Sequence, residues 1–111
     1  MADSAVRELT DESYESEAKE APGWCVVDFY ASWCPHCKAF RPIYEEVAGE
    51  YSGPVKFFAA DVEECEEAAS DCAVRSIPTV VIFHDGDRVD THIGGMTRPD
   101  LCKWLEEKAA E

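Results

Sequence analysis

The chain has 111 residues, of which 46% are hydrophobic and 11% aromatic, and its formal net charge is −14 at pH 7. This length predicts one domain over residues 1–111, and the acidic balance argues against nucleic acids and anionic membranes as partners. No apolar run approaches the roughly 18 residues that cross a bilayer, and Met1 to Glu20 lacks the pattern of an export signal. We therefore expect a cytoplasmic protein, and we also expect it to be a monomer.

The first half of the chain alternates strand and helix patterns. Thr10 is a good helix N-cap, and the acidic residues that follow it suit the positive end of a helix dipole. Pro42 is expected to kink the long helix that contains it. In chain order we predict a weak strand over Val6 to Leu9, a helix from Thr10 to about Glu20, a buried strand over Cys25 to Tyr30 and an amphipathic helix from Cys34 to about Tyr51.

The second half adds a hairpin to this alternation. Asp85-Gly86 is a strong hairpin signal, so the strands on either side of it should be antiparallel. The predicted elements are a turn at Ser52-Gly53-Pro54, a strand over Val55 to Ala60, a short helix over Glu63 to Cys72, strands over Thr79 to Phe83 and Arg88 to Ile93, and a last helix capped by Thr97. This order predicts an α/β fold, with a mixed central β-sheet flanked by helices on both faces.

The segment Cys34-Pro35-His36-Cys37 carries the chemistry that the sequence suggests most strongly. Two thiols separated by two residues can form a reversible disulfide. At a helix start, the Cys34 thiolate is stabilised by free backbone N–H groups and by the helix dipole, so Cys34 should be the nucleophile. Cys37 lies further inside the helix and should resolve the mixed disulfide. A positive charge on His36 would lower the pKa of Cys34 further.

The other cysteines do not complete a metal site. A four-ligand zinc site needs a second close pair, whereas Cys65 and Cys72 are seven residues apart, so we expect neither a metal nor a cofactor. Cys25 and Cys102 are interpreted as packing residues. The remaining histidines, His84 and His92, are expected to face solvent.

The stretch from Phe29 to Lys38 strongly resembles the thioredoxin family. Asp28, Pro42, Ile77-Pro78-Thr79 and Gly94-Gly95 fall where that family has its other marks, and the likeness runs from about Leu9 to Leu105. The resemblance implies a thioredoxin fold and reduction of protein disulfides by reversible Cys34/Cys37 exchange. It also implies a thioredoxin reductase, NADPH-dependent or equivalent, as the source of electrons.

The resemblance also implies roles for residues around the cysteine pair. The Ile77-Pro78 bond should be cis, and a flat substrate-binding surface should contain Trp33, Pro35, Ile77, Pro78 and Gly94. Asp28 resembles a buried carboxylate that accepts the Cys37 proton, and burial should raise its pKa. Ala59 stands where many relatives carry a lysine near this aspartate, so Asp28 is expected to titrate higher here.

A second resemblance concerns Asp61 to Cys72, which is similar to the matching segment of animal cytosolic thioredoxins. In those relatives a regulatory disulfide can form there. In this chain it would join Cys65 and Cys72, and it would require the predicted helix to unwind because seven helical residues rise roughly 10 Å. Inert, partly buried thiols are the alternative.

Pro35-His36 departs from the family, since thioredoxins usually have Gly-Pro between the cysteines and Pro-His is typical of periplasmic disulfide oxidases. We expect an intermediate redox potential. Two alternative functions therefore stay open: a more oxidising disulfide oxidase or isomerase, and a thioredoxin-like module that binds partners with little use of its cysteines.

Overall fold

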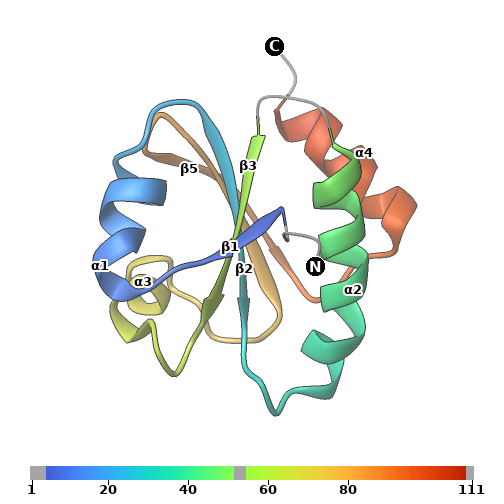
Figure 1. Cartoon of the computed structure of the whole chain (residues 1–111), viewed down its shortest axis with the longest axis horizontal. Coiled ribbons are helices and arrows are strands. Elements are labelled where there is room, and N and C mark those ends of the chain that lie inside the picture. Colours follow the sequence, from blue (N-terminus) through green and yellow to red (C-terminus); the bar gives the residue numbers. More distant parts are fainter. Residues whose placement is uncertain (1–4, 52–54, 110–111) are drawn as a thin grey trace.

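A mixed β-sheet forms the centre of the protein (Figure 1). The computed structural model describes residues 5–51 and 55–109, so the turn predicted at Ser52-Gly53-Pro54 lies outside the described residues. Within these ranges five strands pair in the order β1-β3-β2-β4-β5. Their bounds are Val6–Glu8 for β1, Trp24–Tyr30 for β2, Val55–Asp61 for β3, Thr79–His84 for β4 and Asp87–Ile93 for β5.

Strand β2 is the central strand and leads into the cysteine pair. It runs parallel to β3 and antiparallel to β4, while β1 is parallel to β3 and β5 antiparallel to β4. Every residue from Trp24 to Phe29 is buried. A strand that is covered on both faces is expected to be continuously apolar, and the single charged residue in this one is Asp28.

Helices cover both faces of the sheet, which confirms the predicted fold class (Figure 1). Helices α2 (Pro35–Glu50) and α4 (Arg98–Lys108) lie on one face. On the other face lie α3 (Glu66–Asp71) and α1 (Asp11–Tyr14), which continues as the π-helix η1 (Glu15–Lys19). None of the helices within the described ranges has both the length and the apolar character needed to cross a membrane.

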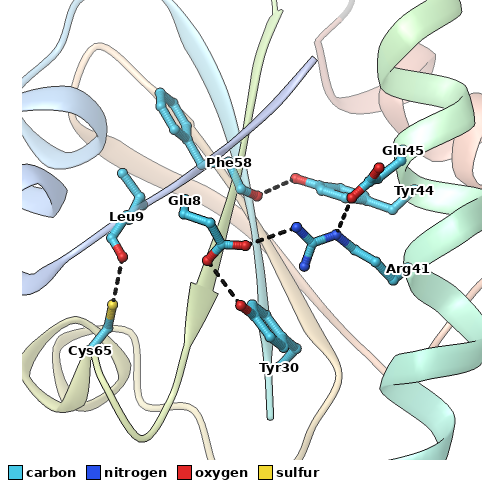
Figure 2. Close-up of polar contacts among 8 residues, drawn as sticks. All are labelled: Glu8, Leu9, Tyr30, Arg41, Tyr44, Glu45, Phe58 and Cys65. Atoms are coloured by element: carbon cyan, nitrogen blue, oxygen red, sulfur yellow. Dashed lines mark hydrogen bonds and ion pairs between the residues drawn. The ribbon is translucent and has the colours of Figure 1, made fainter. Parts of the chain in front are cut away.

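Tyr44 anchors α2 to the strands beneath it. Its side chain is fully buried, and its hydroxyl donates to the Phe58 carbonyl at 2.7 Å (Figure 2) and lies 3.1 Å from the Val26 carbonyl. The hydroxyl therefore spans β2 and β3. This contact fixes the helix that begins at the cysteine pair against the sheet.

The helix predicted over Glu63 to Cys72 is shorter in the structure. Asp61 accepts hydrogen bonds from three successive amides, those of Glu63, Glu64 and Cys65, and the resulting turn delays the start of α3 to Glu66. The prediction was wrong for this first turn because a local side-chain bond competed with the helix.

The sequence suggested that the two histidines beside the hairpin face solvent, but both are only partly exposed in the structure. His84 is half-buried and stacks on Trp24 with ring centroids 4.1 Å apart. His92 is also half-buried and meets the Trp104 ring edge-on at 6.2 Å. Tertiary packing brings each indole next to its histidine, so these contacts could not be predicted from the spacing of the residues in the sequence.

Candidate active site

Cys34 lies at the junction of β2 and α2, where it is the N-cap of the helix. Its backbone is extended (φ −85°, ψ 117°), and its sulfur accepts a hydrogen bond from the Cys37 amide at 3.3 Å. The first turn of α2 carries no acidic residue, so no carboxylate there competes for the positive end of the helix dipole. The backbone N–H groups of the first turn of α2, those of His36 and Cys37, therefore point toward the Cys34 sulfur.

These contacts favour a thiolate at Cys34. The hydrogen bond from the Cys37 thiol lowers the pKa of Cys34 most strongly, and the backbone amides of Cys37 and His36 act in the same direction. Burial and the negative charge of Asp28 oppose them. Because the net effect lowers the pKa of Cys34 while that of Cys37 is raised, Cys34 is the thiol of the pair that ionises more readily.

Cys37 has the opposite environment one helical turn later. It is 3% exposed, and burial together with its hydrogen bond to Cys34 raises its pKa to about 12. All six cysteines are free thiols, so the structure describes the reduced pair. Cys37 needs a proton acceptor before it can act as a nucleophile.

Asp28 is the buried carboxyl group near Cys37. It is fully buried, and among the described residues no group donates a hydrogen bond to either carboxylate oxygen. Burial raises the pKa of Asp28 from 3.8 to about 7, Arg41 lowers it and Glu8 raises it. A group that titrates near neutral pH can take up and release a proton during a reaction.

The residues proposed for substrate contact surround Cys34. Trp33 is 61% exposed, and Pro35 is also exposed. The Cys34 sulfur lies 3.9 Å from the Ile77 carbonyl oxygen, and the Ile77-Pro78 bond is cis. The segments that carry these residues therefore meet at the thiol although they are far apart in the sequence.

Gly94 lies next to Pro78 in the structure. Its amide donates to the Pro78 carbonyl at 2.7 Å, and its φ of 98° lies in the left-handed region that glycine adopts without strain. Neighbouring Ile93 is 68% exposed. The surface around Cys34 thus combines exposed apolar side chains with backbone groups.

Sequence reasoning missed Glu63, which holds the indole of Trp33. The Trp33 Nε1 donates to the Glu63 carboxylate at 2.7 Å. Thirty residues separate the two, and no local pattern links them. The contact places the turn before α3 beside Trp33.

Sequence reasoning also missed Arg41, which lies one helical turn after Cys37. Its guanidinium contacts Glu8 and Glu45 and lies over the Tyr30 ring (Figure 2). The i, i+4 spacing from Cys37 could have placed Arg41 on the same side of α2. Nothing in the sequence could have placed Glu8 beside it.

Cys65 and Cys72 lie away from the active pair, in the apolar cluster on the α1 and α3 face of the sheet. The Cys65 sulfur donates to the Leu9 carbonyl at 3.1 Å (Figure 2), and the Cys72 sulfur lies 3.3 Å from the Tyr14 hydroxyl. Burial raises the pKa of both thiols, that of Cys65 to about 11. Each thiol has its own partner in the reduced protein, and the regulatory disulfide stays a prediction.

Comparisons with known proteins agree on one family. The thioredoxin family model matches residues 5–107. Thioredoxin C-2 of Corynebacterium nephridii is 37% identical over 98 residues, which cover 88% of this chain and 91% of that protein. Thioredoxin 1 of Synechococcus elongatus is 36% identical over 104 residues, which cover 94% of this chain and 97% of that protein.

A solved structure matches the fold as a whole. The thioredoxin of Malassezia sympodialis superposes with a TM-score of 0.86 at 26% sequence identity. The superposition covers 99% of this chain and 96% of that one. The similarity therefore extends over the sheet and both helical layers.

Proposed function

The chain belongs to the thioredoxin family and is a thiol–disulfide oxidoreductase, and we propose that it reduces protein disulfides with Cys34 as nucleophile and Cys37 as resolving thiol. The observation that supports these roles is that the pKa values of Cys34 and Cys37 are shifted in opposite directions. The pKa of Cys34 is lowered at a helix N-terminus, while burial raises that of Cys37 to about 12.

The first step forms a mixed disulfide. The Cys34 thiolate attacks one sulfur of the substrate disulfide, the substrate S–S bond breaks, and the departing sulfur takes a proton from solvent. The exposed indole of Trp33 and the backbone of Ile77 and Pro78 would hold an extended substrate segment beside the thiolate. Pro35 and Gly94 would complete this surface.

The second step releases the reduced substrate. Cys37 gives its proton to the Asp28 carboxylate and attacks Cys34, so that the Cys34–Cys37 disulfide forms as the bond to the substrate breaks. Two electrons pass to the substrate, which leaves as a dithiol after its second sulfur is protonated. Asp28 suits this role because its pKa of about 7 allows it to accept a proton at neutral pH.

We further infer the setting in which this cycle runs. A thioredoxin reductase would return two electrons to the Cys34–Cys37 disulfide, because the protein supplies none of its own. The cytoplasm is the proposed location, and a single domain over residues 1–111 would act as a monomer. In this setting the substrates are disulfides of other proteins.

Replacement of each cysteine tests the roles. We expect Cys34→Ser to abolish reduction of a protein disulfide such as insulin, and Cys37→Ser to accumulate mixed disulfides through Cys34 that mass spectrometry detects. Cys102→Ser is the matched control, since Cys102 is partly buried against the α2 and α4 core and should leave turnover unchanged. An active Cys34→Ser variant would contradict the mechanism.

A disulfide oxidase or isomerase is the second candidate, and Pro35-His36 favours it. A more stable thiolate makes the reduced form more stable and the protein a stronger oxidant. The His36 side chain is exposed, and its effect on Cys34 stays a prediction. Typical reductases and strong oxidases of this fold lie roughly 150 mV apart, or about 7 kcal/mol.

The equilibrium redox potential against glutathione separates the two candidates. Tryptophan fluorescence can report the state of the pair because Trp33 adjoins Cys34. We expect a potential between the two reference values and nearer the reductase, since the rest of the scaffold is that of thioredoxin. A redox potential close to that of the strong oxidases would favour a disulfide oxidase or isomerase over a reductase.

A further inference from the structure

A row of three residues crosses the sheet beneath α2. In the strand register, Glu8 of β1 pairs with Ala59 of β3, and Ala59 pairs with Asp28 of β2. Side chains of laterally paired residues point to the same face of a sheet, so all three face α2. Two strand spacings put the Cα atoms of Glu8 and Asp28 about 10 Å apart. Ala59 contributes only a methyl group between the two carboxyl groups.

Glu8 is held in place from two sides. One of its carboxylate oxygens accepts the Tyr30 hydroxyl at 2.9 Å, and the other accepts Arg41 Nη2 at 2.8 Å (Figure 2). Arg41 also donates from Nε to Glu45 at 2.7 Å, and its guanidinium carbon lies 5.1 Å from the centre of the Tyr30 ring. The ion pair of Glu8 and Arg41 therefore has a defined position relative to Asp28.

Few other charges face Asp28. Its lateral neighbours Ala59 and Val80 are uncharged, and α4 contributes apolar side chains to this part of the core. The titratable or charged groups that the described contacts place around this row are Cys34 at the start of α2, Cys37, Arg41, Tyr44 and Glu45 on α2, Glu8 on β1, Tyr30 on β2, and His92 at the β5 end of the same row. Arg41 is paired with both Glu8 and Glu45, and of these three charges Arg41 and Glu8 act on Asp28.

We propose that Glu8 and Arg41 are positioning residues that set the proton affinity of Asp28 and thereby the pH at which it can take the proton of Cys37. Arg41 favours the carboxylate of Asp28, and Glu8 opposes it both through its own charge and by neutralising Arg41. The inference rests on the proposed role of Asp28 in the resolving step. The two charges act on the pKa of Asp28 in these directions, after the larger effect of burial.

Titration of the Asp28 carboxyl carbon by 13C NMR tests this directly. In the disulfide form neither Cys34 nor Cys37 titrates, so the midpoint belongs to Asp28. At the separation of about 10 Å between Glu8 and Asp28, a unit charge partly screened by solvent should move that midpoint by about half a pH unit. We expect Arg41→Gln to raise the midpoint and Glu8→Gln to lower it, while the double variant returns close to the unmodified protein.

Two controls separate charge from structure. Arg41→Lys keeps the charge and should keep the midpoint. Arg98→Gln removes a guanidinium that contacts Glu46 and Glu50 near the far end of α2, and it should leave the midpoint unchanged. Glu8 is half exposed, so Glu8→Gln should fold normally and decide the sign of the effect on its own.

The same variants should shift the pH dependence of the resolving reaction, in which Cys37 attacks Cys34. A mixed disulfide between Cys34 and a small thiol can be prepared, and the pH at half-maximal attack by Cys37 should follow the Asp28 midpoint in each variant. Shifts of the Glu8 and Arg41 variants in the same direction, or no shift in either, would overturn the inference. Because the titration needs no turnover, this result is distinct from failure of disulfide reduction in the unmodified protein, which would contradict the proposed function instead.

Discussion

At the scale of single residues, Asp28 opposes stability while serving the proposed reaction. Its carboxyl group is fully buried, and no described residue donates a hydrogen bond to it. A buried ionised group without a partner is unfavourable, so the protein holds Asp28 neutral up to a pH of about 7. The same burial that destabilises the ionised protein gives Asp28 the pKa that its proposed role as proton acceptor requires.

This predicts a pH-dependent gain in stability for Asp28→Asn. Between the ordinary pKa of 3.8 and the folded value of about 7, the folded protein keeps the proton and the unfolded chain releases it, so stability falls as pH rises. The penalty reaches up to about 4 kcal/mol at pH 8. The advantage of Asp28→Asn should therefore grow by about 2.5 kcal/mol between pH 5 and pH 8 in urea unfolding.

Asp87→Asn serves as the control for that measurement because Asp87 is exposed. Its difference from the unmodified protein should stay nearly constant with pH. A constant difference for Asp28→Asn as well would mean that the carboxyl group is not desolvated. Activity should fall in the same variant, since an amide cannot accept the Cys37 proton.

At the scale of the elements, the turn between β4 and β5 ties the sheet to the helical layer behind it. Asp85 and Gly86 both have positive φ, 52° and 89°, as a two-residue hairpin turn of this hand requires. The Asp85 carboxylate accepts the Gly23 amide at 2.6 Å. A Cβ at Gly86 would lie 2.5 Å from the Lys19 carbonyl oxygen, so a side chain there meets backbone at the end of η1.

Two glycine substitutions should consequently have opposite effects. Gly86→Ala adds both backbone strain and a clash, and it should destabilise the protein by about 1 to 3 kcal/mol. Gly49→Ala places a methyl group in open space inside α2 and should stabilise it by about 0.5 to 1 kcal/mol. Urea unfolding of both variants checks the signs, and an unaffected Gly86→Ala variant would show that the turn can shift away from η1.

At the scale of the whole molecule, charge should govern which disulfides react fastest. The chain has 24 acidic and 10 basic residues, and Glu63 lies beside the exposed indole of Trp33. A molecule with this net charge attracts cations over distances set by the ionic strength. The apolar surface around Cys34 is thus approached through a negative field.

Reduction of matched disulfide peptides tests this field. A lysine-rich peptide should be reduced about tenfold faster than a glutamate-rich peptide of the same length at low salt, because electrostatic steering acts on the encounter. The difference should collapse at high salt, where the Debye length is only about 3 Å at 1 M. Stopped-flow fluorescence gives both rates, and equal rates at low salt would show that the acidic shell plays no part in selection.

Local patterns in the sequence determined the order of strands and helices, the Asp85-Gly86 hairpin and the position of Cys34 at a helix start. Each of these depends on residues within a few positions of one another, such as the apolar run of β2 or the helical spacing that follows Cys37. The specific thioredoxin fold was predicted from the family resemblance around Cys34 and Cys37. The same local reasoning placed the start of α3 three residues too early, because it could not weigh the capping of a turn by Asp61.

Only the tertiary structure decided which charges lie near Asp28. Glu8, Ala59 and Asp28 come from three strands, and their alignment depends on a register that the sequence does not encode locally. Arg41 reaches Glu8 only because α2 packs across that row. The candidate reacting thiols can thus be identified from a short motif, whereas the proton affinity of Asp28, their proposed acceptor, depends on burial and on charges brought together by folding.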